Sequence, residues 1–317
     1  MPVRLGMSTG NRKNYLPVAR GDNGDEYDDE LTMSEMMVPP FFKCWSFTVV
    51  ITFVELGFFV LSLLIRKEKA NLSLDKFLEP PPCALYILGA KWTSNILHEH
   101  QYYRLVMPLF LHGGLFHILS NIMCQIYIGF LVEKALSASE LSLQVFQGEI
   151  NSKGSFRLFL LYVISSIGGV LFSAVGDPQI LTIGASCAVL GLVGVLCAFL
   201  FMIWLKFLSP SCFCWQDGDR DDIQLFRALC MFSVLVAALS FVSGALTPAV
   251  DNFGHVGGFV TGLLLGPAFM PPLPDRGHTF FVRNYVWMSV CLLLVLVGRL
   301  LFSLYAMNIP HNPMKCD

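Results

Sequence analysis

Long apolar runs constrain the fold of this chain more than any other feature of its sequence. A helix needs ~20 apolar residues to cross the hydrocarbon core of a membrane. Hydrophobic residues make up 55% of the 317 residues and charged residues only 14%, whereas about 25% are charged in soluble domains. Seven runs stand out, at residues 44–65, 112–131, 158–175, 186–207, 226–246, 252–269 and 285–306. We therefore predict an all-α fold, a polytopic membrane bundle of seven transmembrane helices.

The runs define one membrane domain, residues 44–306, with a tail at each end. Residues 1–43 are polar and carry an acidic cluster, and they lack the apolar core of a signal peptide. We expect a disordered cytosolic tail there and a short C-terminal tail at residues 307–317. The connection after the first run is long, and its second half mixes aromatic and basic residues, a combination that favours the headgroup zone. We expect a folded element that lies partly in the membrane surface.

Lys and Arg in short loops indicate the orientation of the spans. They follow the second, fourth and sixth runs, and the loops after the third and fifth runs hold none. The N-terminus is therefore expected in the cytosol, and even-numbered spans begin on the lumenal side. Arg66, Lys67 and Lys69 after the first run disagree, but long connections obey the rule poorly. Because acidic tails are unlike transit peptides, the secretory pathway or plasma membrane is favoured over the mitochondrion.

Charge and cysteine patterns exclude several classes of protein. The net charge is −2 and no basic patch occurs, so nucleic acid is not an expected partner. Most of the ten cysteines lie within the runs and do not form a secreted disulfide framework. Cys212 and Cys214 follow the fourth run, where acylation and plain loop cysteines are both open. His98 and His100 do not share a helix face as zinc ligands do, and we expect neither a metal nor a cofactor.

Polar residues at the front of three spans suggest chemistry. Ser186 opens the fourth run and His255 lies near the start of the sixth. His117 and Asn121 lie in the first turns of the second run, so all four fall at a similar shallow depth. A polar residue in a span is costly and indicates a functional site by default. A serine and a histidine at one depth suggest a nucleophile and its general base.

Glycines explain how the two helices could meet. Gly254, Gly258 and Gly262 recur at four-residue spacing on the sixth run, and Gly191 thins the fourth. Small residues at this spacing let membrane helices approach closely. The close approach is needed because the imidazole must reach the hydroxyl at about 2.6–3.2 Å.

The negative oxygen of a tetrahedral intermediate needs fixed donors. Ser186 stands at a predicted helix N-terminus, where unpaired N–H groups and the dipole favour an anion. Asn121 could add its amide and His117 a ring N–H.

These motifs resemble those of the rhomboid family of intramembrane serine proteases, over residues 85–262. The segment Gly184-Ala185-Ser186 resembles the nucleophile motif of the family, and the His of its His-x-Gly-Gly motif corresponds to His255. His112, His117 and Asn121 match its pattern of two histidines and an asparagine.

The resemblance implies the rhomboid helical bundle, with Ser186 and His255 as a dyad that has no third acid. It also implies that His117, Asn121 and the Gly184 segment help to bind the oxyanion. A seventh span after the histidine helix resembles the eukaryotic secretase-type layout. The implied partners are the lipid bilayer and single-pass membrane proteins, which the family cuts near helix-destabilising stretches.

Four departures from the family pattern are visible, and one of them is Leu190, which stands where some members have a tyrosine that stacks on the catalytic histidine. Tyr103-Arg104 stands where Trp-Arg is usual, and Cys187 follows the nucleophile where glycine is common. An insertion at about residues 135–153 separates the family's Glu133 from its Gly-Ser-x-Arg element at residues 154–157. We expect little loss of activity from the tyrosine or the insertion, and a reshaped pocket from the cysteine.

Simpler interpretations stand beside the catalytic one. A lone serine in a membrane helix usually bonds to its own helix. Asp251 either caps the sixth helix or orients His255 as a triad acid. Glu55 and Arg299 lie within spans, where we expect a structural partner or snorkelling. Two rival functions remain: a catalytically inactive rhomboid-like protein that binds membrane helices for retention or degradation, and a transporter or channel.

Overall fold

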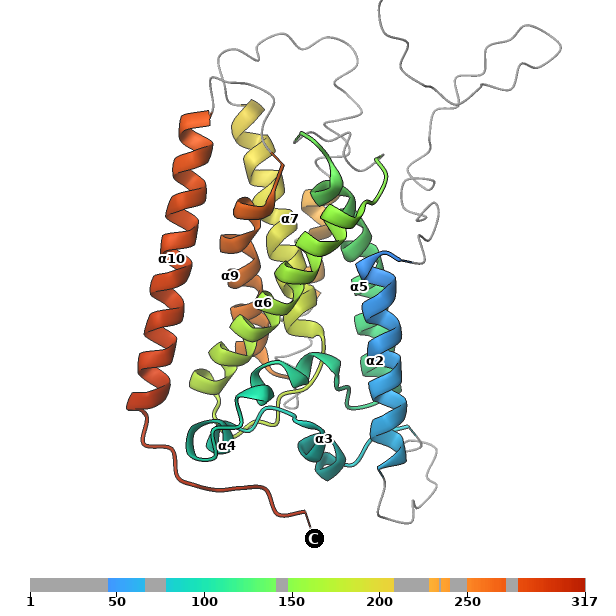
Figure 1. Ribbon diagram of the computed structural model, residues 1–317, viewed down its shortest axis with the longest axis vertical. Coiled ribbons are helices and arrows are strands. Elements are labelled where there is room, and N and C mark those ends of the chain that lie inside the picture. Colours follow the sequence, from blue (N-terminus) through green and yellow to red (C-terminus); the bar gives the residue numbers. More distant parts are fainter. Residues whose placement is uncertain are drawn as a thin grey trace, which may run out of the picture. The chain divides into compact units, whose positions relative to one another are not determined.

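A computed structural model describes residues 45–65, 78–140, 148–207, 228–233, 235–239, 250–271 and 279–316 (Figure 1). The described residues all belong to the unit that spans residues 41–317. They form helices and contain no β-strand, apart from one isolated bridge between Lys91 and Thr182. The all-α prediction is confirmed. The predicted tail at residues 1–43 lies outside the described residues.

Five described helices are long and apolar enough to cross a membrane. They are α2 (Phe47–Leu64), α5 (Leu115–Ser137), α6 (Ser152–Gly176), α7 (Ser186–Phe207) and α10 (Thr279–Ala306). The sixth predicted span forms α9 (Asn252–Phe269), which is not among the five. The fifth predicted span is helical at residues 228–233 and 235–239, and its remainder lies outside the described residues, as do Cys212 and Cys214.

Helix ends differ from the apolar runs where capping groups decide them. Asn151 accepts a hydrogen bond from the Gly154 N–H at 2.9 Å, so α6 begins six residues before its apolar run. α5 starts at Leu115 and continues to Ser137, which leaves His112 in the preceding loop. Both ends of the predicted insertion, residues 135–137 and 152–153, are helical.

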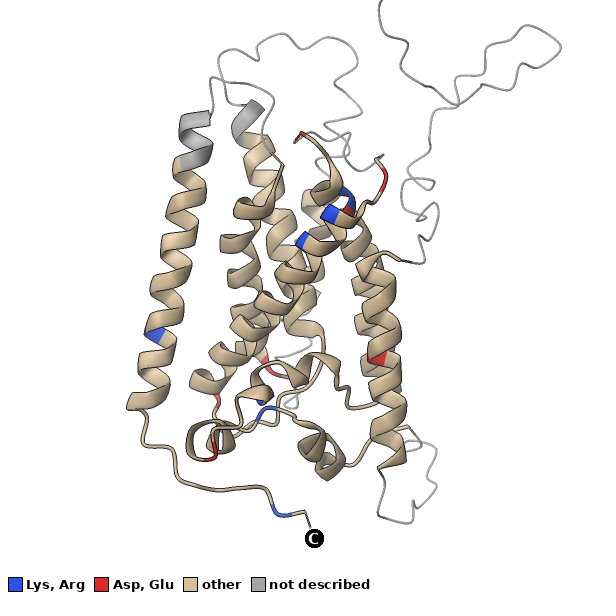
Figure 2. Cartoon of the chain, in the orientation of Figure 1, with Lys and Arg blue, Asp and Glu red and all other residues tan. Residues whose placement is uncertain are grey.

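The helices are uncharged over most of their length (Figure 2). Glu55 in α2 is an exception and is fully buried; its Oε1 bonds the hydroxyl of Tyr162 in α6 at 2.9 Å. That hydroxyl also bonds Gln125 of α5. Arg299 lies over the ring of Phe302, 5.8 Å from its centroid, and is exposed. Glu55 thus has the structural partner that its position in a span requires.

Glu133 joins the other ends of the same helices. Its carboxylate accepts hydrogen bonds from the Phe47 N–H at 2.8 Å, the Thr48 hydroxyl at 2.7 Å and the Ser155 hydroxyl at 2.5 Å. The first two groups lie at the N-terminus of α2, where an anion is favourable. Glu133 and Ser155 are therefore brought together despite the insertion between them.

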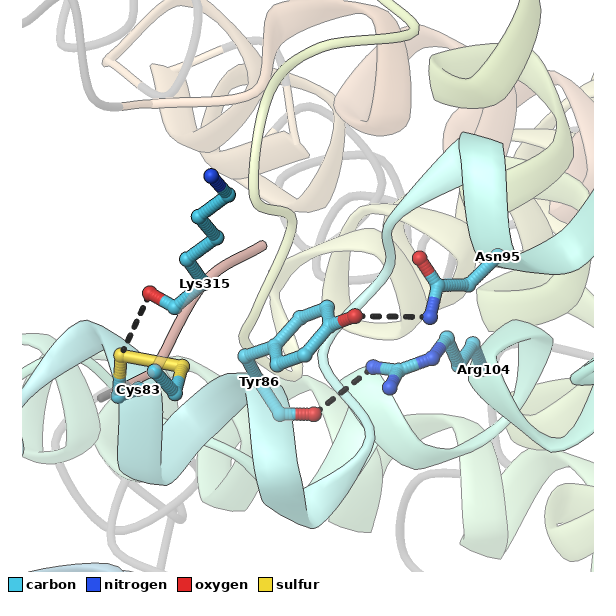
Figure 3. Close-up of a disulfide and its surroundings, with 6 residues drawn as sticks. Cys83, Tyr86, Asn95, Arg104 and Lys315 are labelled. Atoms are coloured by element: carbon cyan, nitrogen blue, oxygen red, sulfur yellow. Dashed lines mark hydrogen bonds between the residues drawn. A yellow bond between two sulfur atoms is a disulfide. The ribbon is translucent and has the colours of Figure 1, made fainter. Parts of the chain in front are cut away.

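The second half of the long connection after α2 is folded, as expected. It contains α3 (Pro82–Leu88), α4 (Thr93–His98) and two 3₁₀ turns, η2 (Tyr102–Leu105) and η3 (Met107–Phe110). Arg104 is buried at its centre, 4.4 Å above the ring centroid of Tyr86, and donates to the carbonyls of Tyr86 at 2.8 Å and Ala90 at 2.7 Å (Figure 3). Arginine satisfies several carbonyls at once, which stabilises a compact loop without a sheet.

The C-terminal segment, residues 307–316, is fastened to this element. A disulfide joins Cys83 in α3 to Cys316 (Figure 3). Trp92 donates to the Asn312 carbonyl at 2.7 Å, and the Asn312 N–H donates to the Ser94 hydroxyl at 2.8 Å. Sequence patterns did not predict this disulfide, because the two cysteines stand 233 residues apart.

α7 forms the centre of the bundle. In its most apolar stretch 83% of the residues are buried, against 17% in that of α10. Its backbone lies directly against α9. A Cβ atom added at Gly258 would collide with the Cys187 carbonyl, and one at Gly262 with the Gly191 carbonyl. A Cβ at Gly254 would come within 2.9 Å of the Cys187 sulfur. Only glycine permits a contact this close.

Gly262→Ala is expected to destabilise the protein by about 1–3 kcal/mol, because the added methyl group forces the two helix backbones apart. Gly298→Ala is the matched control, since nothing lies within 4 Å of a Cβ at that position in α10. Thermal unfolding in detergent should show a lower midpoint for Gly262→Ala and little change for Gly298→Ala. Equal unfolding midpoints for the two variants would contradict the close contact between the backbones of α7 and α9.

Candidate active site

The nucleophile candidate Ser186 is positioned by the loop that precedes α7. Gly184 has a positive φ of 112°, which glycine adopts without strain. Its N–H donates to the Pro108 carbonyl at 2.9 Å, and the Ala185 N–H donates to Nε2 of His112 at 3.4 Å. These bonds tie the loop to the 78–114 connection. Ser186 then opens the helix, and the first N–H groups of α7 have no helical carbonyl to bond.

α9 brings His255 to this helix end. Nε2 of His255 lies 2.8 Å from Oγ of Ser186, within the range for a general base and its nucleophile. The His255 ring is 6% exposed, and Ser186 is partly accessible. The predicted pair, Ser186 and His255, is therefore in contact where the glycines of α9 pack against α7. The Cys187 side chain packs against Gly169 and Gly254.

His117 places a ring N–H near Ser186. Its Nδ1 accepts the Gly113 N–H at 3.3 Å, so the proton of the neutral ring is on Nε2. A Cβ atom at Gly184 would lie 2.8 Å from His117 Nε2 and 3.6 Å from Ser186 Oγ. His117 Nε2 and Ser186 Oγ therefore both lie beside the position that a Cβ atom would occupy at Gly184. A carbonyl oxygen attacked by Ser186 would meet a ring N–H there.

Asn121 is oriented differently. Its side chain is 7% exposed, and its amide nitrogen donates to the His117 carbonyl, one turn earlier in α5, at 2.9 Å. In this conformation the amide satisfies its own helix. Asn121 would have to rotate to donate to an anion beside Ser186.

Asp251 caps α9, as one of the two interpretations predicted. Its Oδ1 accepts the Gly254 N–H at 2.8 Å, and its Oδ2 accepts the Thr182 hydroxyl at 2.6 Å. Neither carboxylate oxygen bonds the ring of His255, whose Nδ1 has no hydrogen-bond partner among the described residues. The geometry is that of a dyad without a triad acid.

Sequence patterns missed two residues beside the site. Lys91 and Thr182 form the β-bridge of the structure, and both side chains are buried. Thr182 stands four residues before Ser186, in a segment with no repeating pattern. A lysine in a loop normally indicates an exposed position, so no signal in the sequence pointed to its burial.

Metal chemistry has no candidate site in the part of the chain that the structure describes. No group of three His, Cys, Asp or Glu side chains is arranged to hold an ion there. The ring of His112 packs edge-on against His117, with centroids 5.3 Å apart, and one of its nitrogens accepts the Ala185 N–H.

Comparison with known proteins gives these residues a family context. The family model described as "Rhomboid domain" matches residues 99–272, more than half of the chain. RHOMBOID-like protein 1 of Arabidopsis thaliana is 32% identical over 210 residues, which cover 66% of this chain and 45% of that protein. Rhomboid-like protease 5 of Toxoplasma gondii is 30% identical over 203 residues, 64% of this chain and 20% of that protein.

A further relative carries an organelle in its name. RHOMBOID-like protein 6, mitochondrial, of Arabidopsis thaliana is 30% identical over 207 residues, 65% of this chain and 56% of that protein. The chain therefore spans between a fifth and just over half of the length of these three relatives.

Gly184→Ala should disturb the site, because alanine is strained at a positive φ by roughly 1–3 kcal/mol and its methyl group would displace the His117 ring. We expect a lower unfolding midpoint and loss of labelling of Ser186 by a fluorophosphonate probe. Gly57→Ala in α2 is the control, since nothing lies within 4 Å of a Cβ there. Normal labelling of Gly184→Ala would show that the tight loop is not required.

Proposed function

Because this chain belongs to the rhomboid family, we propose that it is an intramembrane serine endopeptidase that uses Ser186 and His255 as a catalytic dyad. One observation carries the proposal: the 2.8 Å separation of the Ser186 hydroxyl and the His255 imidazole. The two residues lie in the first turns of two different helices, so the contact is not a by-product of local sequence. A lone serine with a structural role in a membrane helix usually bonds within its own helix.

The chemistry follows from the donors and acceptors in place. His255 Nε2 takes the Ser186 proton while Oγ bonds to the substrate carbonyl carbon. The negative oxygen meets His117 Nε2–H and the free N–H groups at the start of α7. The imidazolium then protonates the leaving amine as the C–N bond breaks. Water attacks the resulting ester, His255 takes its proton, and Ser186 is released as the alcohol.

Substrates and orientation follow from the setting of the site. The protein is an integral multi-pass membrane protein, and substrates that reach a site at the helix ends would be single-pass membrane proteins cut in or beside their transmembrane helix. The Cys83–Cys316 disulfide lies at the same end of the bundle as Ser186: Leu85 of α3, two residues from Cys83, packs in one cluster with Ile183, three residues before Ser186. Disulfides persist in oxidising compartments. We therefore propose that this end faces the lumen or the cell exterior, in agreement with the charges of the short loops.

Ser186→Ala and His255→Ala should each lower cleavage of a single-pass substrate by roughly three orders of magnitude or more, because each removes half of the nucleophile–base pair. Purified protein in lipid vesicles, mixed with a panel of single-pass substrates, provides the measurement. Ser166→Ala is the matched control: Ser166 is buried in α6, and its hydroxyl has no hydrogen-bond partner among the described residues.

Unchanged cleavage by either variant would refute the dyad. If the wild type binds membrane helices without cutting any of them, the inactive helix-binding relative is the correct alternative.

His117→Ala should lower kcat by about 10²–10³-fold with little change in KM, because the ring donates to an oxygen that is negative only in the transition state. Steady-state kinetics with one cleaved substrate separates the two constants. A rise in KM at constant kcat would instead assign His117 to substrate binding.

A further inference from the structure

A second hydrogen bond joins the segments that precede the two helices of the candidate dyad. The Thr182 hydroxyl donates to Oδ2 of Asp251 at 2.6 Å, and both residues are buried. Thr182 stands four residues before Ser186, and Asp251 four residues before His255. Each of the two bonds therefore joins residues that are 69 positions apart in the sequence, and the Thr182–Asp251 bond lies just before both helices.

Asp251 transmits its position directly to His255. Its Oδ1 holds the Gly254 N–H at 2.8 Å, and its carbonyl accepts the His255 N–H at 3.1 Å. The first turn of α9 is thus bonded to Asp251 at two points, once through the carboxylate and once through the backbone carbonyl. Because Oδ2 is bonded to Thr182, the carboxylate links that turn to the loop that carries Ser186.

Thr182 is held from its other side by a buried lysine. The Lys91 N–H donates to the Thr182 carbonyl at 3.0 Å. Nζ of Lys91 donates to the Ser173 hydroxyl at 3.0 Å and to the Asp177 carbonyl at 2.7 Å. The Ser173 and Thr182 hydroxyls lie 2.9 Å apart.

The hydrogen bonds that link Lys91, Ser173, Thr182 and Asp251 allow only one assignment of donors and acceptors. Thr182 donates to Asp251, so its oxygen accepts from Ser173. Ser173 then accepts from Lys91, whose ammonium group is a donor only. The path therefore runs from a cation to an anion through two hydroxyls.

Charge compensation explains how a lysine tolerates this burial. Burial lowers the pKa of Lys91 to about 8, and the nearby Asp251 and Asp177 oppose that shift. The side chain therefore remains largely an ammonium group at neutral pH. A buried carboxylate with a distant counter-charge and fixed donors keeps its orientation better than one in water.

We infer that Thr182 and Asp251 are positioning residues for the dyad: their hydrogen bond, anchored by Lys91 through Ser173, sets the approach of His255 to Ser186. This inference rests on the proposed protease function. It assigns the chemistry to Ser186 and His255 and the alignment to a polar clamp outside the reacting atoms. Misplacement of a reacting group by about 1 Å costs roughly 10²-fold in rate.

Three substitutions isolate the clamp. Thr182→Val removes the hydroxyl at constant shape, whereas Thr182→Ser keeps it. Asp251→Ser keeps an oxygen that can cap α9 but cannot also reach Thr182. Thr261→Val is the matched control: Thr261 is equally buried, and its hydroxyl donates within α9 to the Gly257 carbonyl at 2.7 Å.

Kinetics on a cleaved substrate in vesicles, well below the unfolding midpoints, tests the inference. Thr182→Val and Asp251→Ser should each lower kcat by at least about tenfold, with KM within about twofold. Thr182→Ser and Thr261→Val should stay near the wild-type rate. The double variant with Thr182→Val and Asp251→Ser should be no slower than the slower single variant, because both substitutions break the same hydrogen bond.

Wild-type kcat in Thr182→Val, or effects that multiply in the double variant, would overturn the clamp. Destabilisation alone predicts a lower unfolding midpoint without a change in kcat for the folded fraction. If the wild type does not cleave, or cleaves as well with Ser186→Ala, the protease proposal itself has failed. Cleavage by the wild type and by Ser186→Ala is therefore measured before any variant at Thr182 or Asp251.

Discussion

The direct contact between the backbones of α7 and α9 is the constraint on which the site depends. Serine and histidine side chains are short, and they meet only if their helices approach closely. Glycines at positions 254, 258 and 262 place α9 against the carbonyls of α7. Packing in lipid gains little from burial of apolar groups, so close van der Waals contact is the main source of helix association.

Polar groups at one end of the bundle turn this contact into a defined geometry. The 78–114 connection carries buried Arg104 and Lys91, and each donates to carbonyls that would otherwise be unsatisfied. The disulfide between Cys83 and Cys316 fastens the C-terminal segment beneath it. The loop before Ser186 is held by Pro108 and His112. The helices bring the dyad together, and the connection fixes its orientation.

The apolar runs predicted the helical class and most helix positions, since lipid leaves few alternatives for a long apolar segment. α7 and α9 begin where the sequence placed them, because Ser186 and Asp251 mark helix starts. α5 and α6 differ from their apolar runs by several residues: α6 begins where the Asn151 side chain caps it, and α5 begins after Gly114 and continues to Ser137, and hydropathy marks neither boundary.

Side-chain orientation was beyond the reach of the sequence. Spacing placed Asn121 near the site, but its amide turns back to its own helix. The tautomer of His117 depends on one backbone N–H from Gly113. The burial of Lys91 and the Cys83–Cys316 pairing depend on contacts between segments that are distant in sequence. No periodicity or local composition encodes such contacts.

The central claim is that His255 activates Ser186, and covalent labelling tests it most directly. Purified protein would be treated with a fluorophosphonate, and the modified peptide identified by mass spectrometry. A single adduct on Ser186 that is lost in His255→Ala is the predicted result. An adduct on another serine, or undiminished labelling of Ser186 without His255, would contradict it.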